Sequence, residues 1–206
     1  MSVFFTSDHH LGHERILELG AGRPFPNISV HNNTIRENWW KTVSPEDTVY
    51  VMGDIAMGVE FEKNVNIFKA LPGRKLLVPG NHDRIFSGAN NASRIERFWS
   101  VYEDAGFEIL PENTSVVLET AYGVQEVLVS HFPYSGDSHS VVDRYASHRF
   151  VDEGKPIVHG HTHSRSVFND NNVLEFHVGV DAHDYTPVHE SMVVAWLEGL
   201  KTQGVI

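Results

Sequence analysis

The chain begins, after two residues, with the stretch Val3-Phe4-Phe5-Thr6-Ser7-Asp8-His9-His10, in which an apolar run ends in polar residues. Val3–Thr6 has the length and the β-branched and aromatic composition of a strand. Asp8 and His10 stand two residues apart, and such residues project to the same side of extended backbone. The stretch therefore predicts a first strand whose end presents a carboxylate and an imidazole to one place.

Four later segments repeat this arrangement, each with a strand-like run followed by Asp, Asn or His. They are Thr48–Met52 before Gly53-Asp54, Lys75–Val78 before Gly80-Asn81-His82-Asp83, Glu126–Val129 before Ser130-His131, and Pro156–Val158 before His159-Gly160-His161-Thr162-His163. In α/β folds ligands bind at the carboxyl ends of strands, where the loops converge. Gly53, Gly80 and Gly160 each precede a candidate ligand, and glycine tolerates the tight or positive-φ turns that a close approach requires. One such pattern would carry little weight, but five in this order indicate one shared site.

The composition narrows the chemistry of that site. The 206 residues include 14 histidines and no cysteine, which excludes disulfides and thiolate metal ligands. Oxygen and nitrogen ligands suit Mn, Fe, Zn, Ni or Mg. We interpret His31, His148, His183 and His189, which no spacing connects to the five segments, as surface residues or satisfied core residues.

The remaining segments predict a mixed α/β fold. Further strands are expected at Ser115–Glu119, Val173–Val180 and Met192–Trp196, and helices at Thr34–Val43, Val59–Ala70 and Ala92–Ala105. Strand–helix alternation followed mainly by strands favours helices outside packed sheets. The aromatic helix residues Trp39, Trp40, Phe68 and Trp99 are expected in the core.

The length of the chain limits the number of domains, and its charge limits the kinds of partner it can bind. Residues 1–206 suffice for one domain. Since no apolar run has the length of a bilayer span and no basic segment precedes an apolar stretch, we expect a cytoplasmic protein without membrane contact. Acids outnumber bases 27 to 16, and the net charge of −11 argues against binding of duplex nucleic acid. No sequence feature specifies an oligomeric state.

The ordered motifs resemble those of the calcineurin-like metallophosphoesterases. Arg23-Pro24-Phe25, Asp47-Thr48-Val49-Tyr50 and Val178-Gly179-Val180-Asp181 are similar to stretches of a small subgroup common in bacteria and their phages. The resemblance covers nearly the whole chain and implies a four-layer αββα sandwich of two mixed β-sheets flanked by helices, without a cap domain. Ser130 departs from the glycine that many relatives carry before the lone histidine, a change that we expect to be harmless.

The same resemblance implies a centre of two divalent metal ions, with manganese favoured. One ion would take Asp8, His10 and His163, the other Asn81, His131 and His161, and Asp54 would bridge both. Two such ions neutralise a phosphate and lower the pKa of bound water from 15.7 to about 7, so that a metal-bridging hydroxide can attack in line.

The residues after Asn81 carry the other implied roles. His82 would stabilise developing charge or protonate the leaving oxygen, oriented by Asp83, with a structural role as the alternative. Arg84 is a candidate phosphate contact or a surface arginine. His13 is a candidate for lining the site or for starting a helix.

Residues 133–151 start directly after His131 and are not explained by the motifs. They offer stacking and phosphate contacts through Tyr134, Arg144 and Arg149, and loops of this length are often binding loops. We expect this segment to close partly over the site, the alternative being a solvated connection or a helix packed on the core.

The sequence thus predicts a metal-dependent phosphoric ester hydrolase. Small phosphodiesters, such as cyclic nucleotides or 2′,3′-cyclic phosphates, are the favoured substrates. The enzymatic alternatives are a phosphomonoesterase, a nucleotide pyrophosphohydrolase and a nuclease. The non-enzymatic alternative is a catalytically silent metal-binding scaffold.

Overall fold

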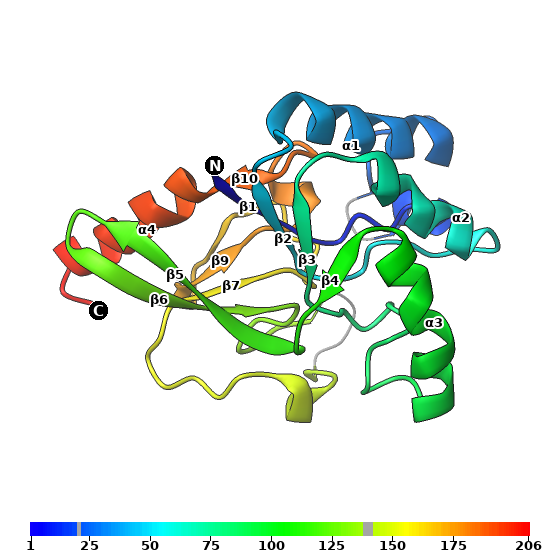
Figure 1. Ribbon diagram of the computed structural model, residues 1–206. Helices are drawn as coiled ribbons and strands as arrows, with labels where there is room; N and C mark the ends of the chain where they lie inside the picture. Colours follow the sequence, from blue (N-terminus) through cyan, green and yellow to red (C-terminus); the bar gives the residue numbers. More distant parts are fainter. Residues whose placement is uncertain (20–21, 138–141) are drawn as a thin grey trace.

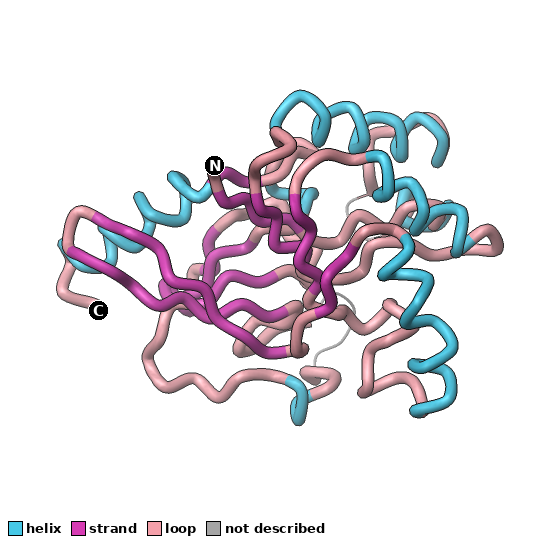
Figure 2. Tube along the Cα trace, viewed as in Figure 1, coloured by secondary structure: helices cyan, strands magenta, loops and turns pink. Residues whose placement is uncertain are grey.

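The structure, a computed structural model, describes residues 1–19, 22–137 and 142–206. Within these residues the strands form two five-stranded sheets (Figure 1; Figure 2). The first has the order β10 (Val188–His189), β1 (Val3–Thr6), β2 (Thr48–Val51), β3 (Arg74–Leu77), β4 (Phe107–Ile109). The second has the order β5 (Asn113–Thr120), β6 (Gly123–Ser130), β7 (Ile157–His159), β9 (Asn172–His177), β8 (Phe168–Asn169). Each sheet mixes parallel and antiparallel pairs, so the predicted class of an α/β sandwich with two mixed sheets is confirmed.

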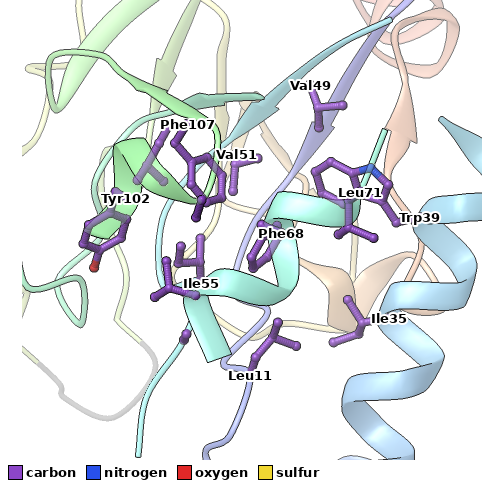
Figure 3. Packing of buried hydrophobic residues seen from close by; sticks show 14 of the residues in the cluster. Leu11, Ile35, Trp39, Val49, Val51, Ile55, Phe68, Leu71, Tyr102 and Phe107 are labelled. Atoms are coloured by element: carbon purple, nitrogen blue, oxygen red, sulfur yellow. The ribbon is translucent and has the colours of Figure 1, made fainter. Parts of the chain in front are cut away.

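Apolar side chains alternate between the two faces of the strands, so both faces of the first sheet are covered by a hydrophobic core, and the helices pack on these cores. On β1, Phe4 belongs to one core and Phe5 to another, because successive side chains of a strand point to opposite faces. The first core lies between the first sheet and the helices α1 (Ile28–Thr42), α2 (Phe61–Asn66), which continues into the 3₁₀ helix η2 (Ile67–Ala70), and α3 (Ala92–Asp104). Figure 3 shows Trp39 and Phe68 packed there beneath Val49.

The second core lies between the sheets and α4 (Glu190–Thr202), which contacts β1 and β10 of the first sheet and β5 and β9 of the second. On the opposite face of the second sheet, Leu128 and Ile157 pack against Tyr134 from the segment that follows β6. That segment contains the short 3₁₀ helix η3 (Ala146–His148).

Two expectations about elements are wrong. Met192–Trp196, predicted as a strand, lies inside α4, where Val193, Trp196 and Leu200 are buried with the spacing of a helix face. The β-branched residues of this run suggested a strand, but contact with both sheets selects the helix. Trp40 and Trp99, expected in the core, are 55% and 39% exposed because they stand on the solvent side of α1 and α3.

The three expected helices are present, but their ends differ from the expected positions. α1 begins at Ile28 rather than at Thr34, because Asn27 caps it by accepting a hydrogen bond from the Val30 amide. Asn91 caps α3 in the same way through the Arg94 amide. Within the described residues, every helix is too short or too polar to cross a lipid bilayer.

The strand order brings the carboxyl ends of both sheets together. β1, β2 and β3 are parallel and in register, and so are β6, β7 and β9 of the second sheet. An isolated bridge between Ser7 and Gly179 joins the end of β1 to the chain that follows β9. All five strands that we predicted to end in Asp, Asn or His are present, and the loops after them meet at this junction.

Candidate metal centre

The loops at the junction hold an unusual backbone conformation. In the described chain, five of the predicted ligands have positive φ: Asp8 (61°), His10 (48°), Asp54 (54°), His161 (68°) and His163 (53°). Each such residue costs on the order of 1–3 kcal/mol and persists only where its surroundings hold it, as at functional sites. Two of them, Asp54 and His161, directly follow a glycine that leaves the room: Gly53 itself has φ 77°, and a Cβ at Gly160 would collide with Ser7 and Asp8.

Asp8, His10 and His163 form the first ligand group, with one ligand atom from each within 4.8 Å of the others. The Nε2 atoms of His10 and His163 are 3.2 Å apart, and the Asp8 Oδ1 lies 3.9 Å from the His163 Nε2. That Oδ1 atom is buried and has no hydrogen-bond partner among the described residues. A buried, unpartnered carboxylate oxygen facing two imidazole nitrogens fits a divalent cation.

Asp8, Asp54 and His131 form the second group. His131 donates from Nδ1 to the Met52 carbonyl at 2.8 Å, so its Nε2 presents a lone pair. This Nε2 lies 3.1 Å from the Asn81 Oδ1 and 3.6 Å from the Asp54 Oδ2. Acceptors that face one another at these distances repel unless a cation lies between them. The Asp54 Oδ2 is also 3.5 Å from the His10 Nε2, which places this carboxylate between the two groups.

His161 lies beside the second group, with its ring centroid 5.1 Å from that of His131. Its amide donates to the Asp8 Oδ2 at 2.9 Å, and its Nε2 lies 3.1 Å from the buried Asp137 carboxylate. The Nδ1 atom is therefore the nitrogen that remains for a metal. A carboxylate that holds the far side of a ligating histidine is a common support for metal sites.

Asp181 supports His163 of the first ligand group in the same way, and Arg23 in turn holds Asp181. Asp181 lies 3.0 Å from the His163 Nδ1. Arg23 binds Asp181 through Nε and Nη2 at 2.9 and 2.7 Å, and also donates to the Asp8 and His9 carbonyls. Sequence reasoning assigned no role to Arg23, Asp137 or Asp181, although Arg23 and Asp181 stand in stretches that support the family resemblance.

Burial and neighbouring charges act on the site in opposite directions. Burial works against the charge on His163, but its hydrogen bond to Asp181 and the Asp8 charge raise the pKa of this imidazole, and burial raises the pKa of the Asp54 carboxyl. Burial lowers the pKa of His10 well below its usual value and that of His161 to about 3. Burial works against the charge on Asp8, but the nearby His163 and His131 hold the pKa of this carboxyl below its usual range. Neutral imidazole and ionised carboxylate are the forms that bind divalent metals.

The predicted catalytic residues occupy different positions. His82 is exposed, its ring centroid is 5.4 Å from that of His10, and its amide donates to the Asp54 Oδ1 at 2.8 Å. Asp83 is buried and accepts hydrogen bonds from the amides of Gly80 and Asp54 at 2.8 Å. In residues 1–19, 22–137 and 142–206 no hydrogen bond joins Asp83 to the His82 ring. The contacts of Asp83 are therefore with the backbone of the ligand loops.

The predicted substrate contacts divide into two sets. His13 lies near the site, 5.6 Å from His10 between ring centroids, and Arg144 pairs at 2.7 Å with Asp137, the partner of His161. Arg84 instead stacks on Phe61 and Phe98, 3.9 and 4.5 Å from their centroids, on the α3 side.

Tyr134 and Arg149, the other two predicted substrate contacts, make internal contacts in the structure. The Tyr134 hydroxyl donates to the Lys155 carbonyl, and its ring belongs to the cluster on the second sheet. Arg149 is buried and donates to the carbonyls of Pro133 and Gly136, so it organises its own segment. Of the predicted lid 133–151, residues 138–141 lie outside the described part of the chain.

All four histidines that we interpreted as surface or satisfied core residues have a hydrogen-bond partner in the structure. Buried His31 contacts Arg23 Nη1 at 2.8 Å, His148 contacts Glu112 at 2.8 Å, and His183 contacts the His177 carbonyl at 2.8 Å. The fourth, His189, caps α4 by accepting from the Ser191 amide. The interpretation of these four as surface or satisfied core residues agrees with these contacts.

Two mixed sheets pack together, and the ends of their strands gather buried carboxylates and imidazoles. This combination of fold and site is that of a metallophosphoesterase. The chain belongs to the calcineurin-like phosphoesterase superfamily, whose domain model matches residues 1–199. This membership confirms the family resemblance of the motifs.

Relatives cover most of the chain. The Gene 66 protein of Mycobacterium phage D29 is 37% identical over 194 residues, which are 92% of this chain and 93% of the relative. The Gene 66 protein of Mycobacterium phage L5 is 34% identical over 185 residues, 88% of this chain and 87% of the relative. Among solved structures, a protein of unknown function from Aquifex aeolicus aligns with a TM-score of 0.64 and 26% identity, covering 93% of this chain and 97% of that one.

Proposed function

We propose that this protein hydrolyses small phosphodiesters with the help of two divalent metal ions, manganese being the favoured metal. The observation that carries the proposal is the pair of ligand groups that share Asp8. Asp54 lies between them, with one oxygen 3.5 Å from His10 and 3.6 Å from His131. A carboxylate in that position suits a bridge between two cations.

We assign the ligands to the two ions as the family resemblance implies. Asp8, His10 and His163 would hold one ion, and Asn81, His131 and His161 the other, with Asp54 shared. When bound, the two ions supply charge neutralisation of the phosphate and a water molecule of lowered pKa. The contacts of Asp137 and Asp181 support this division, because each holds one histidine of a different group.

His82 is the residue that we assign to the leaving oxygen. Its ring is exposed at the mouth of the centre and makes no side-chain hydrogen bond within the described residues. Its backbone is held by the Asp54 carboxylate, so the imidazole stays near the metal ligands while it remains free to exchange a proton. Arg144, fixed by Asp137 and 37% exposed, is the candidate contact to a phosphate oxygen.

A small anionic substrate fits the charge of the molecule better than a duplex does. With a net charge of −11, the protein repels a long polyanion, whereas two bound cations would attract a single phosphate locally. A phosphomonoesterase, a nucleotide pyrophosphohydrolase and a nuclease remain the enzymatic alternatives, and a metal-binding scaffold remains the non-enzymatic one.

The test combines metal titration with turnover on a substrate panel. We expect the metal-stripped protein to bind close to two Mn²⁺ ions by calorimetry and to cleave 2′,3′-cyclic nucleotides but not duplex DNA. Asp54→Ala should lose binding of both ions, because it removes the bridge. His82→Ala should keep the metal content and lose about 10²–10⁴-fold in turnover on a diester with a poor leaving group.

Each alternative predicts a different result. Full activity at one tightly bound ion would exclude the dinuclear centre. Preference for monoesters, pyrophosphates or duplex DNA would select the corresponding enzyme, and metal binding without any hydrolysis would select the scaffold.

A further inference from the structure

A recess of about 560 Å³ opens beside the first ligand group. It lies between the loop that leads to η1 (Glu14–Leu17), the start of α1 and the residues of α2, which neighbour one another in Figure 1. His13 lines it, and the centroid of its ring is 5.6 Å from that of the ligand His10. We call this recess the His13 pocket and define it by His13, Ser29, Asn32, Asn33 and Asn64 with their neighbours Ile28 and Ile67. Its volume lies within the range of roughly 300–1,000 Å³ that is usual for small-molecule sites.

The wall of the His13 pocket combines neutral hydrogen-bonding groups with the charged side chains of Glu14, Arg15, Glu60 and Lys63, of which Lys63 and Glu60 pair with each other at 3.0 Å. The Asn32 Oδ1 is engaged by the Gly12 amide, and the Asn64 Nδ2 donates to the Met57 carbonyl at 3.0 Å. The opposite atoms of these amides, Asn32 Nδ2 and Asn64 Oδ1, have no hydrogen bond within the described residues. The same holds for the side chains of Ser29 and Asn33 in that part of the chain, and the His13 Nδ1 is buried without a partner there. The pocket therefore offers donors and acceptors from α1, from α2 and from the loop that carries His13.

The chemistry of this wall selects a class of ligand. Amide side chains pair with the edges of nucleobases, because one amide supplies a donor and an acceptor side by side. Ile28 and Ile67 add apolar surface against which a planar ring can pack. A lipid tail would leave the amides unpaired, and such unpaired groups reject a ligand that lacks the matching polar atoms.

We propose that the His13 pocket binds the nucleoside part of a phosphodiester substrate whose phosphate lies at the metal centre. The proposal rests on the proposed function and narrows its substrate class from small diesters to nucleotides. It also specifies the part of the substrate that His13, predicted from the sequence as a possible lining residue of the site, would contact. Binding in the pocket orients the phosphate. The oxygen of a water molecule forms a bond to phosphorus while the bond from phosphorus to the leaving oxygen breaks, and a proton of that water passes to the leaving oxygen, which leaves as a hydroxyl group of the product.

The first test fills the pocket. Ser29 is exposed on the first turn of α1, so Ser29→Trp should block the recess without touching a metal ligand. We expect KM for a 2′,3′-cyclic nucleotide to rise about 10-fold or more, while kcat/KM for methyl p-nitrophenyl phosphate stays within about 2-fold of wild type. Ser100→Trp, at an exposed position on α3, is the matched control and should change neither value. Equal losses on both substrates, or none on either, would overturn the proposal.

The second test separates the pocket from the chemistry. Adenosine and uridine, which carry no phosphate, are titrated into metal-free wild-type, Ser29→Trp and Ser100→Trp proteins by calorimetry. We expect saturable binding that only Ser29→Trp weakens, by about 10-fold or more. Lack of nucleoside binding by a protein that hydrolyses the methyl diester would overturn the pocket and leave the phosphoesterase function standing. Nucleoside binding by a protein that hydrolyses neither diester would support the pocket and contradict the function.

Discussion

At the scale of single residues, Arg23 links parts of the metal centre that no ligand joins directly. Its guanidinium is 2% exposed, pairs in bidentate fashion with Asp181 and donates at 2.7 Å to the carbonyl of Asp8. Asp181 in turn holds His163. One side chain therefore fixes the backbone of one ligand and the ring of another, as residues behind metal ligands commonly do.

This network predicts the effect of replacing Arg23. Arg23→Gln should lower the affinity for Mn²⁺ by about 10–100-fold, because outer partners of metal ligands have effects of that size. Arg23→Lys should not restore it, since an ammonium cannot bind a carboxylate in bidentate fashion. Calorimetric titration of each variant measures this, with Arg36→Gln on the exposed side of α1 as the control. Wild-type Mn²⁺ affinity in Arg23→Gln would show that the network does not organise the centre.

At the scale of elements, the site depends on where strands end and helices begin. The parallel register of β1, β2 and β3 delivers Asp8, Asp54 and Asn81 to one edge. The start of α1 matters as well, because its first residues, Ile28 and Ser29, line the His13 pocket. No acidic residue supports the first turn of α1, so its start relies on the Asn27 cap.

The cap leads to a prediction about stability. Asn27→Ala removes the acceptor for the Val30 amide and should cost about 1 kcal/mol of unfolding free energy. Asn27→Asp keeps an acceptor in the same place and should stay close to wild type. Denaturant unfolding of the three proteins measures the difference. A loss in Asn27→Asp as large as that in Asn27→Ala would indicate that packing, not capping, sets the start of α1.

At the scale of the whole molecule, the two sheets are joined by groups that repel one another in the metal-free state. Asp8 and Asp54 come from the first sheet, whereas His131, His161 and His163 follow strands of the second. Buried carboxylates and facing lone pairs in this junction need a cation to offset their repulsion. Metal binding should therefore stabilise the packing of one sheet on the other.

The corresponding prediction concerns thermal unfolding. Mn²⁺ at 100 times its dissociation constant should add about 2.7 kcal/mol to the stability of the wild-type protein. For a chain of this length each kcal/mol raises Tm by roughly 2–4 °C. EDTA should reverse the shift, and Asp54→Ala, which removes the bridge between the two ions, should show little of it. The same Tm with Mn²⁺ and with EDTA would contradict a metal centre at the junction.

Much of the candidate site could be predicted from the sequence because its ligands follow strand ends at short, regular spacing. Asp8 with His10, and His161 with His163, stand two residues apart, and a glycine directly precedes Asp54, Asn81 and His161. The identity of the supporting residues was decided only by the tertiary structure. Asp181 meets Arg23 across 158 positions of the chain, and no local pattern reports a contact at that separation.

The same distinction explains where the structure departs from the expected arrangement. Arg84, Tyr134 and Arg149 have the right chemistry and the right position in the chain, but packing turns their side chains toward Phe61 and Phe98, the second sheet and their own segment. Met192–Trp196 has strand-like composition and is helical because α4 must bury one face against both sheets. By itself the sequence determined which residues can ligate a metal and at which strand ends they stand, since these properties depend on residue type and short-range spacing. Only the tertiary structure decided which way each side chain points and which carboxylate supports which histidine, because these depend on contacts between segments far apart in the chain.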